Sequence, residues 1–207
     1  MSARVPALWL CADLDHPAAG ELVARVTAVV TATPACVWLR GGGASARAML
    51  STARALRGVT RAEGSALVVG DRLDVAALCE ADGVHLPGRG VSPEDARRLT
   101  RGWLSAAVHD AAEVDAARGR VDVMVLSPFG VVAGKGEALG AEGFAALRRR
   151  AGDCAVIALG GVTGPSDVRA ALGAGADGVA VRRALLDAGD PARACAALAE
   201  ALARRGD

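Results

Sequence analysis

Aromatic residues are almost missing from this sequence of 207 residues, which has three tryptophans, two phenylalanines and no tyrosine. Proteins that bind single-stranded nucleic acid stack the bases on aromatic rings, and few rings are left here for that role. An excess of charge of one sign is missing too, because 24 Lys and Arg residues balance 23 Asp and Glu residues. The composition therefore argues against nucleic acid as a partner.

Paired cysteines, a long apolar run and an N-terminal signal pattern are also missing. No CxxC pair occurs and the number of cysteines is odd, which argues against a zinc site. We expect the thiols to be reduced and, in apolar runs, to behave as small hydrophobic groups. No run reaches the roughly 18 apolar residues of a membrane span, so we expect a cytoplasmic protein with no membrane partner. The five cysteines are Cys11, Cys36, Cys79, Cys154 and Cys195.

Short apolar runs alternate with helical patterns along the whole chain. A continuous apolar run is typical of a parallel strand that is buried on both faces. Eight such strand–helix units predict an α/β fold, namely a (β/α)8 TIM barrel that forms a single domain over residues 1–207. An open doubly wound sheet is the alternative, although no GxGxxG fingerprint follows the first run. The runs lie at residues 7–15, 35–43, 66–71, 83–87, 103–109, 121–128, 155–161 and 178–181.

The stretches between these runs carry helix signals. Ala, Leu and Arg recur at helical spacing in segments such as 20–32 and 45–58. Ser92 precedes Pro93 and two acids, the order expected at a helix N-terminus. The segment TGPSD at 163–167 has the same character. Two short segments, ADGVHL at 81–86 and ADGVAV at 176–181, are also alike, and an ancient half-barrel duplication is one hypothesis for them.

Two adjacent glycines end the seventh predicted strand, and an Arg follows the eighth. Barrel enzymes carry their chemistry at the carboxyl ends of the strands, with a phosphate site often formed by the loops after strands seven and eight. A glycine lets backbone amides approach phosphate oxygens, and helix N-termini nearby add favourable dipoles. We therefore predict a phosphate-binding site at Gly160, Gly161, Val181 and Arg182. The alternative is that the glycines only permit a tight turn.

Several motifs together resemble the thiamine phosphate synthase and thiazole tautomerase superfamily over about residues 8–186. The motifs are AVIALGGVT, AGADGVAV, VVGDRLDVAALCEADGVHL and the short AVH. The resemblance implies a (β/α)8 barrel that binds a thiazole phosphate through loops seven and eight. In the synthase branch it also implies a hydroxymethylpyrimidine diphosphate and a magnesium ion, with the thiazole nitrogen displacing pyrophosphate.

The motifs of the synthase branch are only partly present. The family pattern Gln-x-Arg-x-Lys is WLRGG at 38–42, which keeps Arg40 but replaces the glutamine with Trp38. The pattern Asn-Asp-Arg is GDR at 70–72, which keeps Asp71 as a candidate magnesium ligand. The second metal-binding acid of the family, five residues after the His of His-Leu, is Gly90 here. Most of the motif residues that the resemblance assigns to the diphosphate are therefore replaced, while the motif residues that it assigns to thiazole phosphate are intact.

The tautomerase branch isomerises a thiazole carboxylate phosphate without a cofactor, and Pro87 after His-Leu is more like that branch. Its proton-carrying histidine, however, corresponds to Pro128 in this sequence. In the loop after strand six both family threonines are lost, and Lys135 remains. The resemblance thus places the chain closer to the tautomerase branch than to a standard synthase.

These comparisons yield the candidate residues. The candidates for acid–base chemistry are Asp71, Lys135 and His85. Their alternatives are structural: Asp71 holding Arg72 or capping the next helix, Lys135 serving as a charged clamp, and the histidines acting as landmarks of the fold. The candidate ligand-binding residues are Arg40 as an anion clamp, Trp38, which either fills the pyrimidine space or stacks on a ligand, and His109.

Four functions remain open. The leading hypothesis is a thiazole tautomerase-like enzyme that binds thiazole phosphate. A non-catalytic protein that binds thiazole phosphate or thiamine phosphate is the first alternative, and a true synthase with a degenerate diphosphate site is the second. A different reaction on another small phosphorylated compound comes last. No cofactor is expected, and magnesium at Asp71 is expected only if synthase activity is retained. A homodimer is left open as the assembly.

Overall fold

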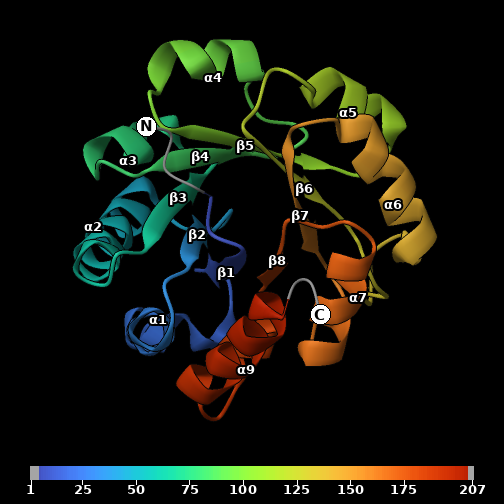
Figure 1. Cartoon of the computed structure of the whole chain (residues 1–207). Helices are drawn as coiled ribbons and strands as arrows, with labels where there is room; N and C mark the ends of the chain where they lie inside the picture. Colours follow the sequence, from blue (N-terminus) through green and yellow to red (C-terminus); the bar gives the residue numbers. More distant parts are fainter. Residues whose placement is uncertain (1–4, 205–207) are drawn as a thin grey trace.

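The computed structural model describes residues 5–204, in which eight parallel strands form a closed barrel (Figure 1). Each strand pairs with the next along the chain, and the last pairs with the first. This closure confirms the predicted (β/α)8 barrel and rules out the open doubly wound sheet. The strands are β1 (Leu8–Asp13), β2 (Cys36–Arg40), β3 (Ala66–Gly70), β4 (Gly83–Leu86), β5 (Trp103–Val108), β6 (Val123–Leu126), β7 (Ala155–Leu159) and β8 (Gly178–Val181).

Every strand is followed by a helix on the outside of the barrel (Figure 1). The last helix, α9, lies against both α1 and α7 and closes the outer ring. The helices are η1 (Pro17–Glu21, a 3-10 turn), α1 (Leu22–Ala32), α2 (Ala46–Ala62), α3 (Leu73–Leu78), α4 (Pro93–Leu99), α5 (Ala111–Ala117), α6 (Gly140–Ala151), α7 (Pro165–Gly173), α8 (Arg183–Leu186) and α9 (Pro191–Ala203).

Both predicted caps form. The hydroxyl of Ser92 accepts a hydrogen bond from the amide of Asp95 at 3.1 Å, at the start of α4. The carboxylate of Asp167 accepts from the amides of Thr163 at 2.8 Å and Gly164 at 3.1 Å, at the start of α7. These bonds satisfy donors that have no partner inside a helix.

The core has two layers because side chains alternate along each strand. In β1, Leu8, Leu10 and Ala12 face the helices, while Trp9 and Cys11 lie inside the barrel. Burying a leucine of this kind contributes about 1.5 to 3 kcal/mol. The inner layer consists of Trp9, Cys11, Cys36, Trp38, Ala66, Val68, Val123, Val125, Ile157 and Ala180.

The same alternation brings charged residues to the carboxyl ends of the strands on the inner face. Asp13 is two residues beyond Cys11, Arg40 is two beyond Trp38, and Arg182 is two beyond Ala180. Asp13 and Arg40 are also partners in the register of β1 and β2. The fold therefore gathers these three side chains at one end of the barrel.

The thiols follow the expectation for small hydrophobic groups. All five cysteines are free, four are buried, and Cys154 is half-buried. Among residues 5–204, no helix is long and apolar enough to cross a membrane.

Candidate functional site

A cavity of about 240 Å³ lies at the carboxyl ends of the strands, between the loops that follow β6, β7 and β8; we call it the carboxyl-end cavity. It brings together seven of the ten predicted site residues: Arg40, His109, Lys135, Gly160, Gly161, Val181 and Arg182. The other three, Trp38, Asp71 and His85, do not line it. Ser127, Thr163 and Arg183 also line this cavity, and the sequence interpretation did not include them.

The two glycines of the predicted phosphate site have a structural reason of their own. Gly160 has φ +91° and Gly161 has φ +73°, which are conformations that favour glycine. A Cβ on Gly161 would lie 2.5 Å from the Cα of Gly130, in the loop after β6. The amide of Gly130 donates to the carbonyl of Gly160 at 2.8 Å, so the two loops pack backbone to backbone. The backbone conformation and the close packing of the two loops therefore require glycine at both positions, whether or not a ligand binds here.

Backbone amides around this turn are nonetheless free. In the described part of the chain, no hydrogen bond is formed by the amides of residues 160–162, or by those of Arg182 and Arg183. The next two amides, of Thr163 and Gly164, are taken by the carboxylate of Asp167. The carboxylate of Asp167 therefore already occupies two donors at the N-terminus of α7, and a phosphate in this cavity would meet the amides of residues 160–162 instead.

The charged groups on the cavity wall all have the same sign. Arg40, Lys135, Arg182 and Arg183 line it, and no Asp or Glu does. Lys135 is the only lysine of the sequence and forms no ion pair within residues 5–204. Cationic side chains beside free amides are complementary to a phosphate group, whose oxygens accept charge-assisted hydrogen bonds.

Asp13 lies beneath two of these cations and was missed in the sequence. Its carboxylate is only 3% exposed, and it accepts from Arg182 Nη1 at 2.9 Å. It also lies 3.5 Å from Arg40 Nε, and it accepts from the amide of Asp15 at 3.1 Å. Both arginine side chains remain 41 to 44% exposed. Asp13 therefore holds the guanidinium of Arg182 by a hydrogen bond and lies within ion-pair distance of Arg40, while both arginine side chains stay partly exposed.

His109 stands at the edge of the cavity on the loop after β5. Its Nδ1 lies 2.8 Å from Glu113 Oε2, which also accepts from the His109 amide at 2.7 Å. Since the carboxylate accepts at Nδ1, the other ring nitrogen is the acceptor in the neutral imidazole. His109 is thus held in one orientation by the first turn of α5.

Trp38 and His85 lie together inside the barrel. Their ring centroids are 4.0 Å apart, and His85 Nδ1 is 3.0 Å from the hydroxyl of Ser105. Burial, with a smaller contribution from Arg40, lowers the pKa of His85 to about 3. The indole N–H of Trp38 has no hydrogen-bond partner among the described residues. This packing favours the structural alternative for His85, and for Trp38 the alternative of filling space.

Asp71 stands apart from the cavity. Its side chain is exposed, with φ +62°. Neither proposed structural alternative for it holds, because Arg72 pairs with Asp74 at 2.6 Å and α3 has no side-chain cap. A Cβ on Gly90 would lie 3.0 Å from Asp71 Oδ1, so the residue facing Asp71 is the one that lacks a side chain.

These residues do not fit the magnesium ion that the synthase branch implies. Magnesium binds oxygen ligands in octahedral geometry, commonly with one or two carboxylates. Among the described residues, no group of three or more His, Cys, Asp or Glu side chains could hold a metal ion. Asp71 is a single carboxylate beside a glycine.

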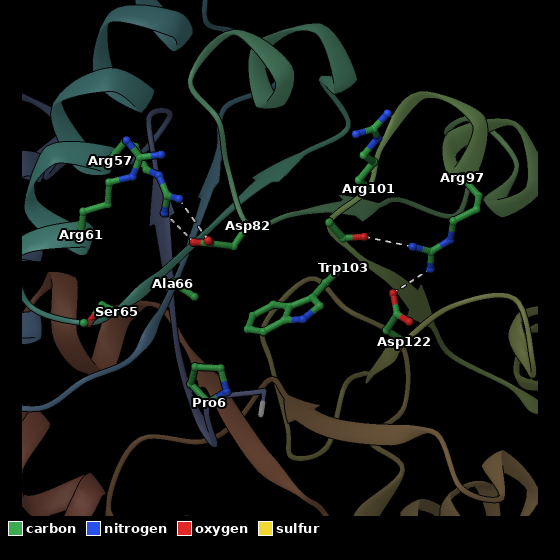
Figure 2. Close-up of a pocket in the computed structure, with 12 residues that line it drawn as sticks. Pro6, Arg57, Arg61, Ser65, Ala66, Asp82, Arg97, Arg101, Trp103 and Asp122 are labelled. Atoms are coloured by element: carbon green, nitrogen blue, oxygen red, sulfur yellow. Dashed lines mark hydrogen bonds and ion pairs between the residues drawn. The ribbon is translucent and has the colours of Figure 1, made fainter. Parts of the chain in front are cut away.

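A larger cavity of about 630 Å³ opens at the amino ends of the strands; we call it the amino-end cavity (Figure 2). Figure 2 shows that both aspartates on its wall are already paired, Asp82 with Arg57 and Asp122 with Arg97. Barrel enzymes carry their chemistry at the opposite end. The carboxyl-end cavity is therefore the candidate site, despite its smaller volume.

A closed (β/α)8 barrel with a cationic cavity at the carboxyl ends of its strands defines the class: a TIM barrel whose candidate site lies where barrel enzymes have theirs. The sequence model described as Thiamine monophosphate synthase matches residues 9–185. The chain belongs to the thiamine monophosphate synthase family, which confirms the resemblance seen in its motifs.

The chain is 38% identical over 172 residues to a thiamine-phosphate synthase from Methanoculleus marisnigri, with 81% of each chain covered. It is 36% identical over 200 residues to one from Xanthobacter autotrophicus, with 94% of each covered. The solved thiamine phosphate pyrophosphorylase from Pyrococcus furiosus has the same fold, with a TM-score of 0.85 at 24% identity over 97% of this chain and 96% of that chain. The relatives from Methanoculleus marisnigri and Xanthobacter autotrophicus carry the synthase name, which favours the second alternative over the tautomerase-like one.

Proposed function

We propose that this protein binds a thiazole phosphate in the carboxyl-end cavity and acts on it in thiamine biosynthesis. The proposal rests on the cavity wall, which has four cationic side chains, no carboxylate and free backbone amides. A phosphate monoester carries about −1.5 to −2 charges at neutral pH and has several acceptor oxygens, which this wall complements. Family membership makes thiazole phosphate the first ligand to test.

The geometry favours isomerisation as the reaction, because isomerisation needs only a proton carrier. Among the described residues, His109 is the one histidine on the cavity wall. Glu113 holds its Nδ1, so Nε2 is the ring nitrogen that would carry a proton between atoms of the ligand. Pro128 stands where the tautomerase branch has its histidine, and His109 would act from the neighbouring strand end. Lys135 and Arg182 would hold the phosphate meanwhile.

Thiamine phosphate synthesis is the second candidate, and the names of the relatives favour it. A departing pyrophosphate needs cations near the leaving group. Arg40 and Arg183 would serve that role in this cavity. The single carboxylate at Asp71 speaks against the magnesium that this reaction implies.

Calorimetric titration with thiazole phosphate tests the binding step. We expect saturable binding that weakens by about 1 to 3 kcal/mol in Lys135→Ala, the scale for loss of a charged hydrogen bond. Arg101→Ala is the matched control, since it removes one positive charge at the amino-end cavity and is expected to leave the affinity unchanged. Equal affinity of the protein and Lys135→Ala would remove Lys135 from the site.

Two assays then separate the reactions. NMR spectroscopy of a thiazole carboxylate phosphate would show isomerisation, which His109→Asn should slow strongly if His109 carries the proton. Release of pyrophosphate from pyrimidine diphosphate in the presence of thiazole phosphate and magnesium would instead support the synthase. Binding with neither reaction would support the non-catalytic alternative.

A further inference from the structure

We propose that the amino-end cavity is a second binding site, which takes a nucleotide with its ring on Trp103 and its phosphate groups on Arg101. At about 630 Å³ this cavity is more than twice as large as the carboxyl-end cavity, which has about 240 Å³. Its size suits a ligand larger than a thiazole phosphate. The two cavities lie at opposite ends of the barrel, so this inference does not depend on the proposed function.

Two of the arginines on the wall of the amino-end cavity serve the fold. Arg57 donates to both carboxylate oxygens of Asp82, at 2.6 and 3.1 Å. Arg97 donates to Asp122 at 2.7 Å, and both aspartates also accept from strand amides. The negative charges of these two aspartates are therefore already neutralised within the wall.

The other two arginines of the wall, Arg61 and Arg101, are exposed and are not needed by the fold in this way. Arg101 forms no hydrogen bond or ion pair within residues 5–204 (Figure 2). Arg61 pairs with Glu80, but these side chains are 55% and 72% exposed, and an exposed pair of this kind is weak. The wall thus keeps a surplus of positive charge. A guanidinium can donate two parallel hydrogen bonds to a phosphate group.

Trp103 supplies an aromatic ring beside this charge. It is half-buried at the start of β5, packs against the inner layer of the core, and lines the cavity. In Figure 2 its ring lies between the two arginine–aspartate pairs. A Cβ on Gly83, its register partner in β4, would lie 2.9 Å from the Cβ of Trp103, so the missing side chain leaves room for the tryptophan.

Ring and charge come from one short segment, because only one residue separates Arg101 from Trp103. The face of an indole ring stacks on planar heterocycles, nucleotide bases among them. A single-stranded nucleic acid needs a series of such rings, whereas a single nucleotide needs only one. A planar ring that carries phosphate groups therefore matches both features of this wall.

The test is calorimetric titration of the full chain with ADP, with adenosine and with pyrophosphate, in a buffer that contains EDTA. We expect saturable binding of ADP. Adenosine and pyrophosphate should each bind about tenfold more weakly or worse, because each carries only one of the two recognised groups. No saturable binding of ADP up to about 1 mM would overturn the inference. Adenosine or pyrophosphate that binds as tightly as ADP would overturn it too.

Two variants locate the site. Arg101→Ala should weaken ADP binding about tenfold or more, and the exposed position of this side chain leaves the fold intact. Lys135→Ala changes the carboxyl-end cavity and should leave ADP binding unchanged, as should an excess of thiazole phosphate. The opposite result with the two variants, or displacement of ADP by thiazole phosphate, would place the nucleotide in the carboxyl-end cavity and overturn the inference.

Fluorescence tests the role of the ring. The other two tryptophans, Trp9 and Trp38, are only 0% and 5% exposed, so a ligand in the amino-end cavity reaches Trp103. ADP should therefore quench the tryptophan fluorescence of the protein, and Trp103→Phe should lack this quenching. Equal quenching in the protein and in Trp103→Phe would show that the ring is not part of the site and would overturn the inference.

Discussion

At the amino end of the barrel, three aspartates precede β4, β6 and β8, and each ties two strands together. The carboxylates of Asp82, Asp122 and Asp177 accept from amides of the preceding strand at 2.8 to 2.9 Å, and each pairs with an arginine. At the carboxyl end, Lys135 and Arg183 line a cavity and form no ion pair within residues 5–204. One end uses its charges to join strands, whereas Lys135 and Arg183 at the other end join no strands in the described part of the chain.

The comparison also explains the two similar segments of the sequence. Asp82 and Asp177 come from ADGVHL and ADGVAV, and they make the same bonds to β3 and β7. Asp122 makes the same bond to β5 without the full motif. The aspartate that the two segments share therefore has the same structural role in each. Charges at the amino end contribute to stability, which is the usual division in this fold.

The first prediction tests whether the loops at the carboxyl end contribute to the stability of the fold. Gly161→Ala should destabilise the protein by about 3 kcal/mol or more, since a Cβ would press on Gly130 and the positive φ adds about 1 to 3 kcal/mol of strain. Urea unfolding measures the loss. For this reason Gly161→Asp, which looks from the sequence like a test of phosphate binding, would test folding instead. A change below about 1 kcal/mol would show that the two loops do not pack as described.

The second prediction concerns the amino end. Asp82→Ala should lower the free energy of unfolding by about 2 to 3 kcal/mol. The substitution leaves the amide of Leu67 without its hydrogen-bond acceptor and the largely buried Arg57 without its ion-pair partner. Asp82→Asn keeps an acceptor and should lose less. Thiazole phosphate affinity should stay the same in both variants. A loss of affinity with intact stability would reverse the assignment of the two ends.

The third prediction uses the histidine buried between the ends. The pKa of His85 is lowered to about 3 in the folded state, below the value of about 6.5 expected for an unfolded chain. Below about pH 6.5 the unfolded state therefore binds a proton at this histidine and the folded state does not. The free energy of unfolding falls as the pH drops below about 6.5, by up to about 1.4 kcal/mol per pH unit.

His85→Asn is the control for this effect, since it removes the titrating group and keeps a donor toward Ser105. Urea unfolding of both proteins between about pH 6.5 and pH 4.5 gives the slopes, and the variant should have the shallower one. Parallel slopes would mean that His85 is accessible to protons in the folded barrel.

The smallest effect is expected at Trp38. Trp38→Phe removes an indole N–H that has no partner among the described residues, and this offsets part of the packing that is lost. We expect the stability to change by less than about 1 kcal/mol and the thiazole phosphate affinity to stay the same. A large drop in affinity measured by calorimetry would instead make Trp38 a ligand-binding residue.

The barrel could be predicted because buried parallel strands leave an unmistakable pattern. All eight apolar runs contain a strand, and the β7 and β8 loops lie where the count of strands placed them. Glycine and arginine in those loops pointed to Gly160, Gly161 and Arg182, which share one cavity. Local sequence is informative here because strand burial and turn conformation are local properties.

Asp13, Trp38 and His85 could not be assigned in the same way. All three side chains point inward, and the alternation of side chains along a strand predicts that direction. An inward side chain either reaches the cavity or packs inside the barrel. Which of the two it does depends on its position along the barrel axis, and the stagger between strands sets that position. Asp13 reaches the arginines of two neighbouring strands, a contact between residues 169 positions apart in the case of Arg182. No short motif encodes such a contact.

The buried thiols give the protein a set of internal probes. Burial raises the pKa of Cys11 to about 12 and that of Cys154 to about 11, so neither is a thiolate near neutral pH. Only the thiolate reacts with alkylating reagents. Cys11 and Cys36 lie in β1 and β2, and Cys195 lies in α9 on the outer ring. The rate at which each cysteine is alkylated, followed by mass spectrometry, would thus report how often the structure around it opens. These cysteines belong to the natural sequence, so no substitution is needed.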